Sequence, residues 1–182
     1  IRLGSLLANR MSRSVLSNVD YIVPVPSSGN FYAVGFSKAS SIPYLPALRK
    51  REVSERGFEI GNTDRRKGFL IKNMDVNSEL VKGNSIMLID EAIFSGATLR
   101  VVCEVLQDAG ASEIHIAIPS PKCRSDCDYL VLPQRDLLLN RINEMMLPEY
   151  FGAQTVSFLE YDEFVSELPV TNACSECFFF NK

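Results

Sequence analysis

Residues 85–100, SIMLIDEAIFSGATLR, hold the pattern that decides the fold of this 182-residue chain. Four apolar residues, 86–89, form a strand-like run that leads directly into two acids, Asp90 and Glu91. A loop of small residues, 95–98, follows and opens a helical pattern. Such an arrangement places carboxylates, which suit ribose hydroxyls or hydrated Mg²⁺, beside loop amides, which suit a phosphate. The alternative is a buried strand whose polar end meets solvent before an ordinary turn.

The two neighbouring acids favour a binding site. Like charges a few ångströms apart repel by about 4 kcal/mol at an effective dielectric of about 20, so proteins usually give such a pair a cation or hydroxyl donors. A second loop, Pro-Ser-Ser-Gly-Asn at residues 26–30, also follows a strand pattern. Its glycine, amides and serine hydroxyls suit a pyrophosphate, although alone it is more typical of a turn that caps a helix. Its expected position next to residues 85–100 favours a pyrophosphate-binding loop over an ordinary turn.

Short apolar strands alternate with helical patterns along the chain, which predicts an α/β fold: a mostly parallel, twisted sheet with helices on both faces. Ligands of such sheets bind beyond the carboxyl ends of the strands, where both loops lie. The expected strands are 21–25, 43–48, 86–89, 113–118 and 129–132. The expected helices are 3–16, 29–39 and 97–109, with further helical segments in 135–146 and 161–167.

Composition limits the classes of protein to consider. The length suits one domain, and 46% hydrophobic residues can form a substantial core. With 19 basic and 22 acidic residues, the net charge of −3 gives no indication of nucleic-acid or membrane binding. We expect a cytoplasmic protein, since no signal peptide or run of about 18 apolar residues is evident. The chain begins at Ile1 rather than at Met, so we expect a piece of a longer protein.

Residues 85–100 resemble the phosphoribosyl pyrophosphate (PRPP) signature of the phosphoribosyltransferases, and the sharper resemblance is to the amidophosphoribosyltransferase family. Residues 21–44 are similar to that family's pyrophosphate-loop strand, loop and helix. Lys72 falls where the family has a lysine before the signature. Residues 108–127, DAGASEIHIAIPSPKCRSDC, and the closing CSEC at 174–177 match in the same order, so the resemblance covers roughly residues 3–177.

This resemblance implies a type I phosphoribosyltransferase fold in a single domain over residues 1–182, with 133–182 as a C-terminal extension and the family's N-terminal glutaminase domain absent. The implied reaction is displacement of pyrophosphate from Mg²⁺-bound PRPP by ammonia, which gives 5-phosphoribosylamine in purine biosynthesis. The glutaminase domain would supply the ammonia. The family's habit also implies a homo-oligomer.

The resemblance also assigns roles to residues. It implies a pyrophosphate loop of Ser27, Ser28 and Gly29. It places the ribose hydroxyls and Mg²⁺ at Asp90 and Glu91. The phosphate loop would comprise Ser95, Gly96, Ala97 and Thr98. The charged stretch 49–67 would form a mobile lid whose arginines close over pyrophosphate, and the alternative is a solvated loop. Catalytic roles would fall to Arg56, in this stretch, and to Lys72, before the signature strand.

Four positions depart from the family pattern. Ser27 stands where Asp is usual, Glu91 replaces a second Asp, Ser95 replaces a common Arg, and Leu70 stands where an Arg precedes the lysine. The longer side chain of Glu91 could misplace its carboxylate by about an ångström, an error that can cost about 100-fold in rate. A catalytically degenerate PRPP- or nucleotide-binding module is therefore a second hypothesis. A related transferase with another acceptor is a third.

The cysteines and the single histidine need separate interpretations. Cys127, Cys174 and Cys177 match by position a trio that holds a [4Fe–4S] cluster in one branch of the family, and Cys123 could substitute for a ligand. The spacing also suits zinc, and the alternative is reduced thiols packed as small hydrophobes. Cys103 lies in a helical pattern and is expected in the core. His115 lies within a strand pattern and is interpreted as structural.

Overall fold

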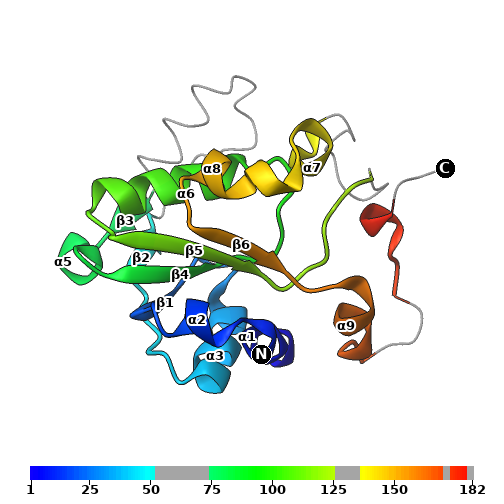
Figure 1. The fold of residues 1–182 in the computed structure, drawn as a ribbon, viewed down its shortest axis with the longest axis horizontal. Coiled ribbons are helices and arrows are strands. Elements are labelled where there is room, and N and C mark those ends of the chain that lie inside the picture. Colours follow the sequence, from blue (N-terminus) through cyan, green and yellow to red (C-terminus); the bar gives the residue numbers. More distant parts are fainter. Residues whose placement is uncertain (52–73, 126–135, 170–172, 180–182) are drawn as a thin grey trace.

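The computed structural model describes residues 1–51, 74–125, 136–169 and 173–179. Its centre is a four-stranded parallel sheet in the order β1-β4-β5-β6 (Figure 1). The strands are β1 (Tyr21–Pro24), β4 (Ser85–Ile89), β5 (Glu113–Ile118) and β6 (Thr155–Phe158). Because the strands are parallel, all of their carboxyl ends lie at one edge of the sheet.

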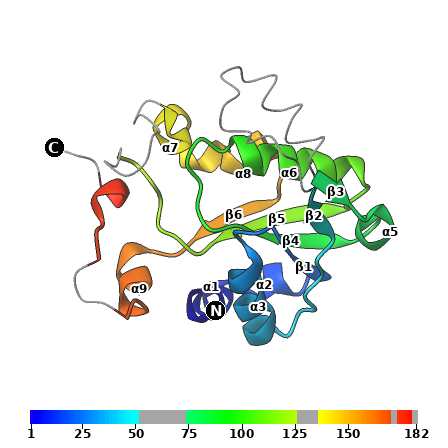
Figure 2. The same ribbon diagram turned by 180° about the vertical axis from the view of Figure 1, so that it is seen from behind.

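Helices cover both faces of this sheet. One face carries α1 (Arg2–Arg10), α2 (Arg13–Leu16) and α3 (Asn30–Ser40), and the other carries α6 (Ala97–Asp108) and α8 (Leu147–Phe151) (Figures 1 and 2). Strand β4 is buried over its whole length. Its side chains alternate between the faces: Ile86 and Leu88 belong to the core cluster that includes α6, while Met87 and Ile89 belong to the cluster that includes α1 and α3. A continuous apolar run is therefore required here rather than an alternating one.

Smaller elements complete the described part of the chain. An antiparallel pair of strands, β2 and β3, stands apart from the main sheet. The bounds of the remaining elements are β2 (Leu48–Lys50), β3 (Met74–Val76), α5 (Ser78–Val81), α7 (Leu138–Arg141), η3 (Glu144–Met146), α9 (Tyr161–Ser166) and η4 (Glu176–Phe178). Over these described residues, the structure contains no helix with the length and apolarity that crossing a membrane requires.

Most of the predicted elements are confirmed, within a residue or two at their ends: the structure has β1, α3, β4, α6, β5 and α9. The prediction of one helix over 3–16 was wrong, because the chain breaks after α1 and Ser12 caps a separate helix by accepting a hydrogen bond from the Val15 amide. The expected strand 43–48 is reduced to a single parallel bridge between Tyr44 and Ile22, followed by β2. The strand expected at 129–132 lies outside the described residues.

Five elements were not expected from the sequence: β3, α5, α8, β6 and η4. Within 135–146, the expected helical segment is divided into α7 and η3 by extended backbone at Ile142 and Asn143. Four residues from 138–151 belong to the larger core cluster, namely Leu138, Leu139, Leu147 and Phe151. This stretch therefore packs into the main core, and β6 adds the fourth strand of the sheet.

Candidate functional site

Two loops meet at the carboxyl edge of the sheet. One joins β1 to α3 and the other joins β4 to α6, and they are adjacent because β1 and β4 are neighbours with Pro24 opposite Ile89. The Val25 amide donates a hydrogen bond to the Ile89 carbonyl at 2.8 Å. One step further along, the Ser28 hydroxyl donates to Oδ1 of Asp90 at 2.6 Å. Ser28 and Asp90, which the sequence assigned to two parts of one site, are thus in direct contact.

Gly29 makes the close approach of the two loops possible. A Cβ atom at this position would lie 2.1 Å from the Ile89 carbonyl oxygen and 2.9 Å from the Val25 nitrogen. The sequence interpretation had assigned this glycine to the approach of a ligand. In the structure its small size is also required by the backbone of β4, and Gly29 is the N-cap residue just before α3.

The Asp90 and Glu91 carboxyls interact closely but have different surroundings. Asp90 is only 6% exposed, whereas Glu91 is exposed. Oδ1 of Asp90 accepts hydrogen bonds from Ser28 and from the Glu91 amide, the latter at 2.9 Å. Burial, the hydrogen bond with the Glu91 side chain and the Glu91 charge together raise the pKa of Asp90 to about 8. Burial also raises the pKa of Glu91, but hydrogen bonds from Asp90, from Ser28 and from the Glu91 backbone outweigh burial, so the pKa of Glu91 is lowered.

These opposite pKa shifts indicate that the Asp90 and Glu91 carboxyls share one proton. At neutral pH the buried Asp90 carboxyl keeps the proton and donates it toward the Glu91 carboxylate, which keeps the negative charge near solvent. A pair that holds a proton in this way is also a suitable pair of oxygen ligands for a hard cation, which would replace the proton. The donor set at this position therefore fits Mg²⁺.

The raised pKa predicts how stability of the ligand-free protein varies with pH. The pKa of Asp90 is about 8 in the folded chain against an ordinary value of 3.8, so between these values the unfolded chain releases a proton that the folded chain keeps. This contribution to stability is complete below about pH 4 and declines as the pH rises to about 8, by up to about 1.4 kcal/mol per pH unit. Urea denaturation across this range should show the decline, and Asp90→Asn should flatten it. Equal slopes in both proteins would contradict the assignment.

The loop after Asp90 ends at Gly96, which is the N-cap residue of α6 and has a left-handed φ of +74°. Glycine has no side chain to cap the amides of the first turn, and the nearest substitute is a long 3.4 Å hydrogen bond from the Ala97 amide to the Ser95 hydroxyl. Thr98 lies in this turn and is half-buried. The N-terminus of a 12-residue helix with this capping is suited to an anion.

Two further groups of predicted site residues, the lid residues and the cysteines, lie partly outside the residues that the structure describes. Arg56, Lys72 and Leu70 lie outside the described residues, as does Cys127. Cys174 is exposed, Cys177 is half-buried and Cys123 is buried. Among the described residues there is no group of three or more cysteine, histidine or acidic side chains arranged to hold a metal. The carbonyl of Cys177 accepts hydrogen bonds from the amides of Arg124 and Ser125, just before Cys127 in the chain.

Cys103 and His115 have the surroundings expected of structural residues. Burial, with smaller effects of the Glu104 and Asp90 charges, raises the pKa of the Cys103 thiol to about 12, so it stays protonated in the core. His115 is buried in β5, and its Nδ1 lies 2.9 Å from the Thr155 hydroxyl on the neighbouring strand. Burial lowers the pKa of His115, with Glu113 acting in the opposite direction, so its ring is neutral near pH 7.

Tyr32 was missing from the residues assigned to the site. It lies in the first turn of α3, three residues after Gly29. Burial and the charge of Glu91 raise the pKa of its phenol, so the two side chains are electrostatically coupled. Its position only three residues after Gly29 could have indicated that Tyr32 lies near the site, because a residue in the first helical turn remains near the carboxyl edge of the sheet.

A comparison with protein families matches residues 3–123 to the phosphoribosyl transferase domain. The chain belongs to this family. Among curated proteins, this phosphoribosyltransferase domain is similar to the amidophosphoribosyltransferase of Methanothermobacter thermautotrophicus, with 31% identity over 166 residues, covering 88% of this chain and 35% of that protein. The corresponding protein of Mycobacterium tuberculosis is 30% identical over 182 residues, covering 94% of this chain and 34% of that protein.

A solved structure gives the same result. The glutamine PRPP amidotransferase from B. subtilis, complexed with ADP and GMP, superposes with a TM-score of 0.79 at 26% identity, covering 97% of this chain and 38% of that one. The resemblance to amidophosphoribosyltransferases and the type I phosphoribosyltransferase fold are thus confirmed. The domain spans about a third of the length of the curated relatives that it matches.

Proposed function

We propose that this phosphoribosyltransferase domain binds PRPP with Mg²⁺ and transfers the phosphoribosyl group to ammonia, forming 5-phosphoribosylamine for purine biosynthesis. The nitrogen lone pair forms a bond to the anomeric carbon, the bond from that carbon to pyrophosphate breaks, and pyrophosphate leaves with the electron pair. The amine then loses a proton. No covalent intermediate with the protein is needed, so the protein contributes position and charge.

The roles follow the two loops. Asp90 and Glu91 bind the ribose hydroxyls and serve as candidate ligands for Mg²⁺, which when bound supplies positive charge to the departing pyrophosphate. Amides and hydroxyls of the first loop hold the pyrophosphate, and those of the second hold the 5-phosphate. The residues proposed for these two contacts are Ser27, Ser28 and Gly29, and Ser95, Gly96, Ala97 and Thr98. Arg56 and Lys72 are proposed to neutralise charge on the leaving group.

One observation carries this proposal: the 2.6 Å hydrogen bond from Ser28 to Asp90. It joins the first loop to the acidic end of β4, and the glycine-capped start of α6 follows six residues later. Groups for pyrophosphate, ribose and phosphate are thus available along one edge of the sheet. Ribose hydroxyls that bind Asp90 would replace the hydrogen bonds that it now makes with Ser28 and Glu91.

The same geometry gives reason to retain the second hypothesis, a degenerate PRPP- or nucleotide-binding module. The Glu91 side chain is hydrogen-bonded back onto Asp90, so the carboxylate that replaces the usual Asp already has a partner within the protein. If this bond persists in the complex, the ribose is held by one acid rather than two. Such a protein would bind PRPP without efficient transfer.

Calorimetry with PRPP and Mg²⁺, followed by an assay of ammonia-dependent pyrophosphate release, separates these hypotheses. We expect saturable binding and release of pyrophosphate that requires ammonia. Binding without release would favour the module. Release with another acceptor but not with ammonia would favour a different transferase, and absence of both binding and release would exclude the transferase and the module alike.

Several further features belong to the proposal. We propose that residues 1–182 act as one domain, with 133–182 as its C-terminal extension, and that a glutaminase domain supplies the ammonia. A cytoplasmic homo-oligomer is the assembly that we propose for the whole protein. Cys127, Cys174 and Cys177 stay predicted ligands of a [4Fe–4S] cluster, which analysis of iron and sulfide in anaerobically purified protein would test.

A further inference from the structure

The C-terminal end of the chain is attached to the body of the domain in an unusual way. Leu159, which is 1% exposed, is the last residue along the chain that belongs to either described core cluster. Helix α9 has no buried residue, and neither has η4. In both views these two elements lie to one side of the sheet rather than over its faces (Figures 1 and 2). Apolar burial therefore contributes little to their attachment.

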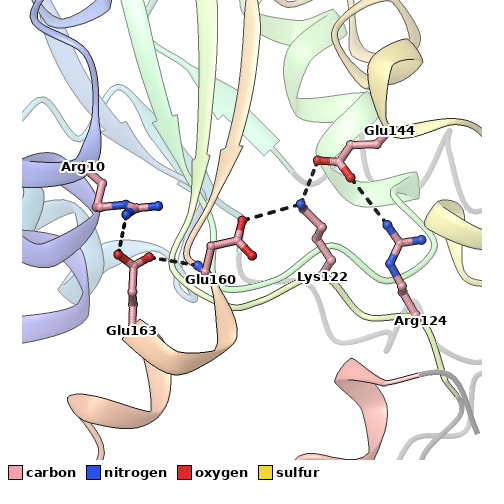
Figure 3. Close-up of polar contacts among 6 residues, drawn as sticks. All are labelled: Arg10, Lys122, Arg124, Glu144, Glu160 and Glu163. Carbon is pink, nitrogen blue, oxygen red and sulfur yellow. Dashed lines mark hydrogen bonds and ion pairs between the residues drawn. The ribbon is translucent and has the colours of Figure 1, made fainter.

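Charged side chains make the attachment instead, and Figure 3 shows most of them. Arg10 at the end of α1 forms an ion pair of 2.7 Å with Glu163 of α9. Arg2 lies 3.7 Å from Glu167, just after the helix. Lys122, after β5, lies 3.7 Å from Glu160 at the start of α9. Three basic groups of the body thus hold three acidic groups of one short helix and its ends.

The last described residues are joined to α9 rather than to the core. Tyr161 and Phe164 of α9 contact the rings of Phe178 and Phe179, with ring centroids 4.7 to 6.2 Å apart. We refer to residues 160–169 and 173–179 as the C-terminal unit. Besides its ion pairs, this unit accepts hydrogen bonds from the amides of Arg124 and Ser125 at the Cys177 carbonyl, from the Ser125 hydroxyl at the Phe179 carbonyl and from Arg2 at the Glu167 carbonyl.

The loop that receives the unit is itself fixed to the body by charge. Glu144 of η3 forms ion pairs with Lys122 at 2.8 Å and with Arg124 at 3.5 Å (Figure 3). Lys122 also lies 5.9 Å from the centre of the Phe158 ring on β6. Lys122 therefore belongs to the body, and its ion pair with Glu160 crosses the boundary between body and unit.

A cavity of about 260 Å³ between the α1–α2 segment and β6 adjoins this boundary, and Glu160 is its one lining residue from the described C-terminal unit. Leu7 and Phe158 contribute apolar walls, while Arg10, Lys122, Glu144 and Glu160 contribute charged ones. The paired side chains at the boundary keep contact with solvent: Arg10 and Glu163 are 51% and 23% exposed, and Lys122 and Glu160 are 24% and 64% exposed. Water and salt ions can reach these pairs, so their attraction is screened more strongly than that of buried pairs.

We propose that the C-terminal unit is a detachable clasp, which separates from the body as one piece while the parallel sheet stays folded. The position of its equilibrium is set by the ion pairs of Arg10 and Lys122, and raising the ionic strength shifts it toward the open form. Because the unit carries the C-x-x-C sequence, opening of the protein without the proposed cluster moves Cys174 and Cys177 together away from the loop at 122–125.

Hydrogen–deuterium exchange with the full chain tests this proposal, since amide exchange reports local opening. Raising NaCl from about 0.1 M to about 1 M shortens the Debye length from about 10 Å to about 3 Å. We expect faster exchange in peptides covering 161–167 and 122–125, with no change in β4 and β5. Arg10→Gln and Lys122→Gln should each accelerate exchange of α9 about five-fold at low salt. Replacing Glu163 would be less informative, because its side chain also caps the helix.

Arg100→Gln is the matched control. Arg100 pairs with Glu104 on α6 at 3.6 Å, and its side chain is 53% exposed against 51% for Arg10. The Arg100→Gln variant should leave amide exchange of α9 unchanged. The clasp would be refuted if α9 exchanged no faster in high salt or in the Arg10 and Lys122 variants, or if the control had the same effect. Acceleration that extended equally to β4 and β5 would also refute it, because the unit would then unfold only with the sheet.

Discussion

Replacing Asp90 with asparagine is expected to weaken binding of PRPP in the presence of Mg²⁺ by about 100-fold or more. Ligand binding at this site would exchange the shared proton of the acidic pair for ribose hydroxyls and a cation. Asparagine cannot supply the negative charge that this exchange requires, and hydrogen bonds to charged groups contribute about 1.5–3 kcal/mol each. Calorimetry at fixed Mg²⁺ concentration measures the loss directly.

The variant should fold normally, which makes the result interpretable. The asparagine Oδ1 atom can still accept the hydrogen bonds from Ser28 and the Glu91 amide, and near pH 7 it replaces a carboxyl that is already protonated. Asp20→Asn is the control. Asp20 accepts a hydrogen bond from the Ser85 amide at 2.8 Å, at the opposite end of β4, and should not affect PRPP affinity. Unchanged affinity in Asp90→Asn would contradict the assigned ribose site.

Gly29→Ala is expected to destabilise the domain by about 3 kcal/mol, near the upper end for an overpacked position. The added methyl group would lie 2.1 Å from the Ile89 carbonyl oxygen. The clashing atoms belong to the backbone of the central strand, so a side-chain rotation cannot relieve the clash. Either the loop or the end of β4 must move, which would also separate Ser28 from Asp90. Chemical denaturation should show a lower midpoint, and PRPP binding should weaken in the fraction that remains folded.

Gly83→Ala provides a comparison at a glycine with a different constraint. Gly83 has a φ of +76°, but nothing lies within 4 Å of where its Cβ would be. That substitution should cost only about 1 kcal/mol, the strain of a left-handed alanine. If the two variants lost similar stability, the close contact of Gly29 with β4 would not be the cause of its effect.

The sequence predicted the central part of the fold because the information there is local. The apolar run at 86–89 needs burial on both faces, and the helical pattern at 97–109 begins immediately after a glycine. Strand β6, with sequence TVSF, was missed because half of its residues are polar. The break between α1 and α2 was missed because the apolar spacing continues through it, and only the capping hydroxyl of Ser12 marks the boundary.

The candidate site was predictable in its residues more than in its electrostatics. Adjacent acids at a strand end indicated a place for a cation or hydroxyl donors, and the serine loop was placed beside them. The sequence contained no sign that one acid is buried and the other exposed, because that difference depends on how the first loop covers the end of β4. It therefore could not predict that Asp90 holds a proton to about pH 8 while Glu91 carries the charge.

The loop proposed to bind phosphate, residues 95–98, depends on a part of the chain far along the sequence. The amide of Leu138 donates a hydrogen bond to the Phe94 carbonyl at 2.7 Å, and Leu138 and Phe151 lie against Gly96. The stretch shared with the general family, residues 3–123, contains neither side chain. A protein trimmed to that stretch would lose the side chains that support Gly96 and would leave the outer edge of β5 open to pairing with other chains. Residues 137–159 thus belong to the packed body of the fold, and engineering of a minimal domain should keep them.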